Sequence, residues 1–300
     1  MKKQIAVFTL VTTLGLSIQP IVSSAETAQN TQAAQQNGWV KDQNGTWFFY
    51  ENGALKTGWL LHDGKWYYLN GDGALALGWI KVEDKWFYLD GNNGGALKVG
   101  WFKYNDNWFY LEESSSDPSK YGALKTGWLL HDGKWYYLEE SSSDPSKYGS
   151  MKTGWVQVDS KWFYLDGNAG GAMVTGWNRI DGKMNYFKDN GQWNENTREL
   201  TVSATAYTND PAENDVEPGQ HVYTKMGDDL TANPNLKVIA VDPSVIPLES
   251  KVYVEGYGIA EARDTGGAIK GNKIDVFIPS KQESSNWGRK TVKIYVLPKN

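Results

Sequence analysis

Three aspartates in the C-terminal third of the chain stand inside or beside β-rich segments, where carboxylates are uncommon. They are Asp242 in AVDPSVIP, Asp264 in ARDTGGAIKG and Asp275 in KIDVF. Asp275 lies between Ile274 and Val276, so its side chain emerges from an apolar run. Removing a carboxylate from water raises its pKa. Asp275 is therefore a candidate proton donor near neutral pH, although perturbed carboxylates also occur in structural networks.

The other two aspartates have a functional and a structural interpretation. Asp264 begins the glycine-rich turn TGGAIKG, and glycines let a backbone approach a ligand closely. Alternatively, Asp264 and Asp242 cap turns by accepting hydrogen bonds from nearby amides. Glu213 and Lys270 are weaker candidates for polar contacts at the same site, with exposed surface charge as the alternative.

A second group of residues with binding chemistry is a ladder of Trp and Tyr at fixed registers. Gly-Trp pairs recur every 20 to 27 residues from Trp39 to Trp177, most are followed seven residues later by a second Trp, and Tyr comes two residues after that. Core packing explains part of this pattern. Cages of aromatic rings also attract quaternary ammonium groups, by about 0.5–2 kcal/mol per ring, and flat rings suit the faces of sugars. The regularity predicts a ligand-binding role.

The elements that must position these rings are β-hairpins. In the unit GWLLHDGKWYYL, two aromatic-rich runs flank an Asp-Gly step, which favours a tight hairpin turn. One hairpin cannot bury its own aromatic face, whereas stacked hairpins bury each other's. Residues 38–193 are therefore predicted to form a β-solenoid. The segment EESSSDPSKYG, at 112–122 and again at 139–149, is predicted to be a loop outside the ladder.

The aspartates require a different scaffold. After Trp193 the repeats stop, and the polar stretch 194–199 is predicted to be a linker. From residue 200 to 300 short β-branched runs alternate with Gly and Pro, which predicts a small closed barrel or sandwich. The whole chain is accordingly expected to be all-β.

The N-terminus carries a targeting signal. Lys2 and Lys3 precede an apolar stretch that Pro20 interrupts, and small residues follow before Glu26. This order predicts a secretory signal peptide over 1–25 and export of the protein. Residues 26–37 are small and polar and are predicted to be a linker. No later apolar run reaches the length of a membrane span, so none is expected in the mature protein.

Composition excludes several function classes. The 300 residues carry a formal net charge of −5, which argues against a nucleic-acid binder with a broad basic face. There is no Cys, hence no thiol nucleophile or thiolate metal site, and the presence of only three His argues against a multi-histidine metal centre. Aromatic residues make up 14%, which excludes a wholly disordered chain. No metal or cofactor is expected.

The units GWLLHDGKWYYLNGDGALALGW and GWVQVDSKWFYLDGNAGGAMVTGW resemble the choline-binding and cell-wall-binding repeats of Gram-positive surface proteins, over residues 38–193. In that family two Trp of one hairpin and a Tyr of the next bind choline, which implies a choline-bearing teichoic acid or similar wall polymer as partner. Similar repeats bind glucans, and this alternative stays open. The implied cages are Trp59, Trp66 and Tyr88; Trp79, Trp86 and Tyr110; Trp101, Trp108 and Tyr137; Trp128, Trp135 and Tyr164; and Trp155, Trp162 and Tyr186.

The string VIAVDPSVIPLESKVYVEGYGIAEARDTGGAIKGNKIDVF closely resembles the three-aspartate (3D) domain. Membrane-bound lytic transglycosylase A and Gram-positive stationary-phase survival muralytic proteins share that domain. The resemblance implies a double-psi β-barrel over 200–300, with Asp275 as the acid and with Asp264 and Asp242 shaping or polarising the site. Glu249 stands where the family usually has Gly.

The resemblance also implies a reaction. The expected substrate is the glycan strand of peptidoglycan, cleaved by a lytic transglycosylase in which one carboxyl group serves as acid and then as base, giving 1,6-anhydro-muramyl products. Two alternatives remain. An inverting glycoside hydrolase acting on peptidoglycan or glucan would use two carboxylates about 6.5–9.5 Å apart. A wall-bound adhesin or scaffold would bind glycan without cutting it.

Overall fold

The computed structural model describes residues 36–113, 120–142 and 146–299. The signal peptide predicted at 1–25 and most of the linker predicted at 26–37 lie outside the described residues. The chain divides into two compact units, Met1–Phe102 with Tyr110–Leu124, and Lys103–Phe109 with Lys125–Asn300. Across the described ranges, no helix is both long and apolar enough to cross a membrane.

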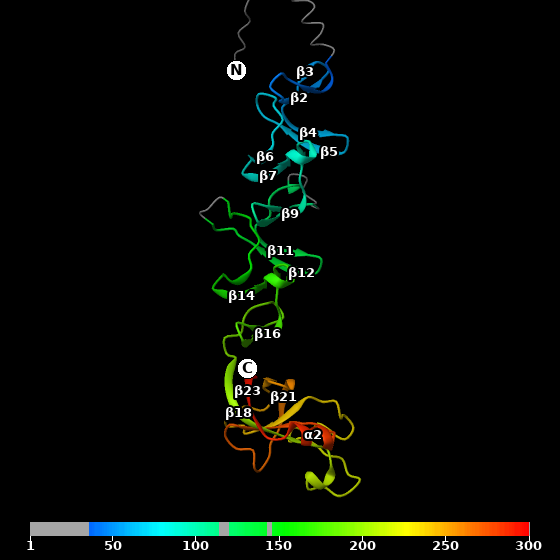
Figure 1. Ribbon diagram of the computed structural model, residues 1–300, viewed down its shortest axis with the longest axis vertical. Helices are drawn as coiled ribbons and strands as arrows, with labels where there is room; N and C mark the ends of the chain where they lie inside the picture. Colours follow the sequence, from blue (N-terminus) through cyan, green and yellow to red (C-terminus); the bar gives the residue numbers. More distant parts are fainter. Residues whose placement is uncertain (1–35, 114–119, 143–145, 300) are drawn as a thin grey trace, which may run out of the picture. The chain divides into compact units, whose positions relative to one another are not determined.

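The aromatic repeats fold as seven antiparallel hairpins in the described part of the chain, three of them with a short third strand (Figure 1). Two 3-10 turns, η1 (Gly91–Asn93) and η3 (Gly167–Ala169), follow the third and sixth hairpins. The strands are β1 (Gly38–Lys41), β2 (Trp47–Glu51), β3 (Ala54–Leu55), β4 (Gly58–His62), β5 (Lys65–Leu69), β6 (Gly78–Val82), β7 (Lys85–Asp90), β8 (Ala96–Leu97), β9 (Gly100–Tyr104), β10 (Asn107–Leu111), β11 (Gly127–His131), β12 (Lys134–Leu138), β13 (Gly154–Val158), β14 (Lys161–Asp166), β15 (Ala172–Met173), β16 (Gly176–Ile180) and β17 (Lys183–Phe187).

The Asp-Gly steps form the tight turns that the sequence predicts. Strands β4 and β5 pair as far as His62 opposite Lys65, which leaves Asp63 and Gly64 as a two-residue loop. Both loop residues have positive φ, 48° and 73°, as a type I′ turn requires. The hairpin prediction is therefore confirmed.

The hairpin register collects the two Trp and the second Tyr of a hairpin on one face. Trp59 lies opposite Tyr68, and Leu61 lies opposite Trp66, so these four side chains share a face because neighbouring positions alternate sides. Leu69, on the other face, is fully buried. Each hairpin thus has an aromatic face and a packed face, which is the arrangement that stacking requires.

The C-terminal strands close into a six-stranded barrel in the order β18-β22-β19-β21-β20-β23. Strand β19 lies between β21 and β22, which follow one another in the chain, and β18 likewise lies between β22 and β23. These two interlocked arrangements are the connectivity of a double-psi barrel, so the predicted fold class is confirmed. The elements are β18 (Arg198–Tyr207), η4 (Pro211–Glu213), β19 (Val238–Val241), β20 (Lys251–Val254), β21 (Gly258–Asp264), β22 (Lys273–Phe277), α2 (Lys281–Trp287) and β23 (Lys290–Leu297).

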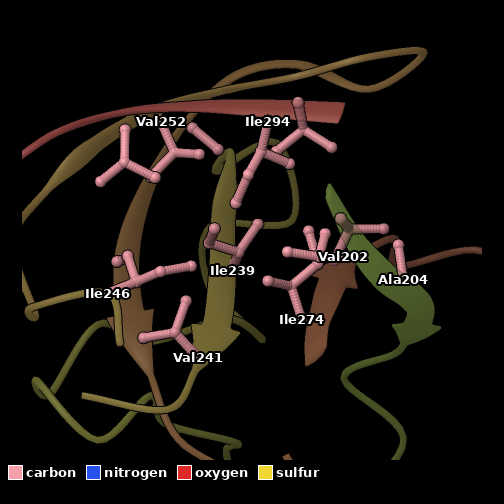
Figure 2. Close-up of a cluster of buried hydrophobic side chains, with 13 residues drawn as sticks. Val202, Ala204, Ile239, Val241, Ile246, Val252, Ile274 and Ile294 are labelled. Atoms are coloured by element: carbon pink, nitrogen blue, oxygen red, sulfur yellow. The ribbon is translucent and has the colours of Figure 1, made fainter. Parts of the chain in front are cut away.

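The barrel is filled by small and β-branched side chains. Alternate residues of all six strands point inward, and most are fully buried (Figure 2). On β22 the inward residues are Ile274 and Val276, both with no exposed surface. Their positions direct the residue between them, Asp275, to the outer face of the barrel.

That outer face is itself partly covered. A second apolar cluster joins Phe277 of β22 and Val238 of β19 to Val222 and Leu230, which belong to the long connection between β18 and β19. One hydrogen bond, from Leu230 N to Val222 O (2.9 Å), closes a loop, here called the 222–230 loop. The connection therefore packs beside the strand that carries Asp275.

Candidate functional site

Asp275 occupies a central position on the outer face of the barrel. It lies opposite Thr205 of β18 on one side and Ala240 of β19 on the other. The side chain is half-buried, and its Oδ1 atom is shielded from solvent without a hydrogen-bond partner in the described structure. An unpartnered buried carboxylate oxygen is costly when charged, so the site favours the protonated acid.

Burial is the main cause that raises the pKa of Asp275, to about 6. A hydrogen bond with Thr205 acts in the opposite direction, and the negative charge of Asp264 adds to the increase. The prediction that Asp275 has a raised pKa agrees with this geometry. A carboxyl group with such a pKa exists in both protonation states near neutral pH, as an acid that later acts as base requires.

A β-bulge brings Asp264 to the same face as Asp275. Ile239 pairs with Ala262, but the next residue, Ala240, pairs with Asp264, so Arg263 is the extra residue. Ala240 therefore has Asp264 on one side and Asp275 on the other. Adjacent strands lie about 4.8 Å apart, which places the two aspartate backbones roughly 10 Å apart.

Asp264 is held by three hydrogen bonds. Its Oδ1 accepts from the backbone N–H groups of Lys225 (2.8 Å) and Thr265 (2.8 Å), and its Oδ2 accepts from the Tyr207 hydroxyl (3.1 Å). Burial and Asp264 raise the pKa of Tyr207, which keeps this phenol protonated as a donor. Asp264 is thus a fixed negative charge beside Asp275.

Asp242 has a different environment. Its Oδ2 accepts from Gly271 N (2.7 Å), and its Oδ1 accepts from the backbone and hydroxyl of Ser244 (3.0 and 2.7 Å). The bond from Gly271 is the largest cause that lowers the pKa of Asp242 to about 2. Asp242 is therefore an ionised anchor that ties the glycine-rich β21–β22 connection to the end of β19.

The weaker candidates, Glu213 and Lys270, interact with residues other than Asp275. Glu213 accepts a hydrogen bond from the Thr208 hydroxyl (2.7 Å), and the charge of Lys270 contributes to the lowered pKa of Asp242. Glu249 adopts a positive φ of 67°, which explains why Gly suits that position.

The 222–230 loop is an element of the site that sequence reasoning missed. Asp228 forms a two-pronged ion pair with Arg263, at 2.8 Å to Nε and 2.9 Å to Nη2, and Met226 N donates to Arg263 O (3.1 Å). The same loop supplies the Lys225 N–H that holds Asp264. The bulge residue Arg263 therefore locks the loop onto the barrel. The only sign of this contact in the sequence is Arg263 itself, which directly precedes Asp264 at the end of a predicted strand.

We expect Asp228→Asn to weaken this lock. The hydrogen bond from Arg263 lowers the pKa of Asp228, so the pair contains an ionised carboxylate. The substitution removes this negative charge and leaves the guanidinium with a weaker partner. Stability should fall by about 1–3 kcal/mol in urea unfolding. Asp215→Asn, in the same connection at an exposed position with positive φ, is the matched control. Equal stability of the two variants would contradict this role for the pair.

The hairpins bring Trp rings together in pairs. In three hairpins the first and second Trp lie edge to face with ring centroids 6.3–6.4 Å apart, and the second Trp is 37–43% exposed. These pairs are Trp59 with Trp66, Trp128 with Trp135, and Trp155 with Trp162. Exposed ring faces at this spacing suit a cationic or sugar ligand.

The third ring of each predicted cage is a Tyr that lies against the first Trp of its own hairpin, at 5.1–5.4 Å. These contacts are Tyr88 with Trp79, Tyr110 with Trp101, Tyr137 with Trp128, Tyr164 with Trp155, and Tyr186 with Trp177. From the following hairpin, Phe87 packs on Trp59 (4.9 Å) and Phe163 packs on Trp128 (4.8 Å). The grouping of each Trp pair with the next hairpin's Tyr stays a prediction.

Family models match both parts of the chain. Residues 237–298 match the model described as 3D domain. Residues 56–101 match the choline-binding repeat, and residues 37–55, 99–114, 126–141 and 153–168 match the putative cell wall binding repeat. The chain thus carries choline-binding-type repeats and a 3D domain, as the sequence resemblance indicates.

Particular relatives share parts of the chain. Cell wall-binding protein YocH of Bacillus subtilis (strain 168) is 64% identical over 103 residues, which are 34% of this chain and 34% of that protein. Putative cell wall shaping protein YabE of the same organism is 58% identical over 105 residues, 35% of this chain and 24% of that protein. The chain therefore spans about a third or less of these relatives.

Among solved structures, choline binding protein F from Streptococcus pneumoniae, in the presence of a peptidoglycan analogue, is similar with a TM-score of 0.45 and 31% identity. The similarity covers 53% of this chain and 52% of that one.

Proposed function

We propose that the protein is a secreted, wall-bound enzyme that cleaves the glycan strands of peptidoglycan as a lytic transglycosylase. The observation that carries this proposal is the half-buried Asp275, with a solvent-shielded Oδ1 and a pKa raised to about 6, beside the fixed charge of Asp264. The match to the 3D domain supports the same assignment.

Asp275 performs both proton transfers. In its protonated form it donates to the oxygen that links N-acetylmuramic acid to N-acetylglucosamine, and that C1–O bond breaks while positive charge develops at C1. The resulting carboxylate then takes the proton of the C6 hydroxyl as O6 bonds to C1. The product is a 1,6-anhydro sugar, no water is consumed, and Asp275 is protonated again. The negative charge of Asp264 favours the cationic transition state.

An inverting hydrolase is the second candidate. Asp264 and Asp275 face the same side across Ala240, at a backbone separation compatible with the carboxyl spacing of about 6.5–9.5 Å that inversion requires. Asp264 would then activate water. Its carboxylate oxygens already accept three hydrogen bonds from the protein, which leaves less room to orient and accept a proton from water and favours the single-carboxyl mechanism.

The repeats hold the enzyme on its substrate. Residues 38–193 bind a choline-bearing teichoic acid or similar wall polymer through the exposed Trp rings, and tethering raises the local concentration of the barrel near glycan. Residues 1–25 direct secretion, residues 26–37 act as a linker, and residues 200–300 form the catalytic domain. The second linker, predicted at 194–199, is shorter than expected, because Arg198 and Glu199 already belong to strand β18. A glucan is the alternative ligand for the repeats.

Digestion of purified peptidoglycan followed by mass spectrometry of the released ends tests this function. Anhydro-muramyl ends support the transglycosylase, and free reducing ends support the hydrolase. Retention on the wall with no released fragment would identify a non-catalytic wall-binding protein.

The pH dependence of the rate follows from the raised pKa of Asp275, about 6. The protonated form must start the reaction, and its fraction falls about tenfold for each pH unit above that value. We expect kcat/KM on soluble glycan fragments to be highest below pH 6 and to decline above it. A profile that stays flat between pH 5 and pH 8 would contradict the role of Asp275 as the acid.

A further inference from the structure

The second inserted segment places a carboxylate on the aromatic face of its hairpin. Glu140 Oε1 accepts a hydrogen bond from the Tyr137 hydroxyl (2.8 Å). Its Oε2 lies 2.8 Å from the position that a Cβ on Gly127 would occupy. Gly127 has a φ of +69°. Glycine at this position therefore leaves the space that the carboxylate occupies.

The first inserted segment repeats this arrangement. Glu113 Oε1 accepts from the Tyr110 hydroxyl (3.1 Å), and its Oε2 lies 2.7 Å from where a Cβ on Gly100 would stand. In the hairpins without an insertion, no atom of the described residues, apart from the two adjoining ones, lies within 4 Å of the equivalent Cβ position. The glycines concerned are Gly38, Gly58, Gly78, Gly154 and Gly176. The inserted segments thus add one carboxylate each to an otherwise open position.

The added charge is coupled to the rings. Tyr137 packs on Trp128 (5.1 Å), which in turn contacts Trp135 (6.3 Å). A phenol that donates to a carboxylate has a more electron-rich ring, and the carboxylate adds a formal negative charge. Both effects strengthen attraction for a cation at the ring faces.

Glu140 also differs from its neighbour. Glu139 is neutralised by Lys152 at 2.8 Å, whereas Glu140 forms no ion pair within the described residues. The negative charge of Glu140 is therefore available to a ligand, while that of Glu139 is not.

Resting on the proposed choline binding, we propose that Glu140 is a specificity-determining residue that makes the aromatic site containing Tyr137 stronger and selective for quaternary ammonium groups over neutral ligands. Glu140 adds a negative charge to this site. Hairpins without the insertion bind through their rings alone.

The test compares a charged and a neutral ligand of the same shape. Full-length protein and the variant Glu140→Gln are titrated with choline and with its uncharged carbon analogue, dimethylbutanol, by calorimetry. Gln keeps the acceptor oxygen for the Tyr hydroxyl and removes only the charge. Glu139→Gln, which removes a carboxylate already paired with Lys152, is the matched control.

We expect Glu140→Gln to lose about three- to tenfold in choline affinity at one of the sites, less at high salt, with dimethylbutanol binding unchanged. Unchanged choline binding, or equal weakening of both ligands, would overturn the specificity role and leave the proposed choline binding intact. Absence of choline binding by the unmodified protein would instead overturn choline binding itself, and this inference with it.

Discussion

Asp275→Asn is expected to abolish glycan cleavage and, at the same time, to stabilise the barrel at neutral pH. The amide has nearly the shape of the acid but cannot transfer the proton, so the rate on soluble glycan fragments should fall by at least about 10³-fold. The measurement is the initial rate of fragment release, with Glu261→Gln, an exposed position on β21, as the control that keeps activity.

The Asn variant should be more stable at neutral pH because burial penalises the charged carboxylate, and Asn carries no charge. The pKa of Asp275 is raised in the folded protein to about 6, so ionisation costs stability as pH rises from about 4 through that value. Since the side chain is only half-buried, we expect the Asn variant to be more stable by about 1–2 kcal/mol at pH 7. Near pH 4 the two proteins should be equally stable. A less stable variant at pH 7 would show that the ionised carboxylate is well solvated.

Replacing the exposed second Trp in three hairpins is expected to release the protein from the wall polymer. Trp66→Ala, Trp135→Ala and Trp162→Ala together remove one ring from each pair, at side chains that are 37%, 43% and 41% exposed. Each ring contributes about 0.5–2 kcal/mol to holding a quaternary ammonium. Retention on immobilised choline should therefore weaken by at least about tenfold.

The control uses the residues directly opposite these Trp. Leu61, Leu130 and Gln157 pair with Trp66, Trp135 and Trp162 across the strands, and the two leucines are 55% and 54% exposed. Their substitution by Ala should leave retention unchanged. Equal retention of the Trp variant and this control would show that the exposed rings do not bind the polymer.

Local patterns in the sequence were sufficient to predict the hairpins and the environment of Asp275. The Asp-Gly step predicts the turn at Asp63 because Gly adopts positive φ without strain. Other hairpins make their turns with two non-glycine residues of positive φ, such as Glu83 and Asp84, which carry a weaker sequence signal. Ile274 and Val276 predict the strand that buries Asp275 because alternation fixes which side each residue faces.

The support around Asp275 depends on contacts between residues far apart in the chain, which no local pattern encodes. The bulge beside Ala240 shifts the register by one residue and turns Asp264 to the outer face. The Tyr207 hydroxyl reaches Asp264 across 57 positions of sequence, and Arg263 reaches Asp228 across 35. Likewise, both Phe87 and Tyr88 are aromatic, and stacking alone decides that Phe87 contacts Trp59.

The most direct test of the single-carboxyl mechanism is digestion of purified peptidoglycan in water enriched in heavy oxygen, with mass analysis of the new glycan ends. Attack by the substrate's own C6 hydroxyl predicts anhydro-muramyl ends that contain no heavy oxygen, and predicts that Asp275→Asn produces none of them. Reducing ends that carry heavy oxygen would contradict the account, because water would then be the nucleophile and a second carboxylate its base.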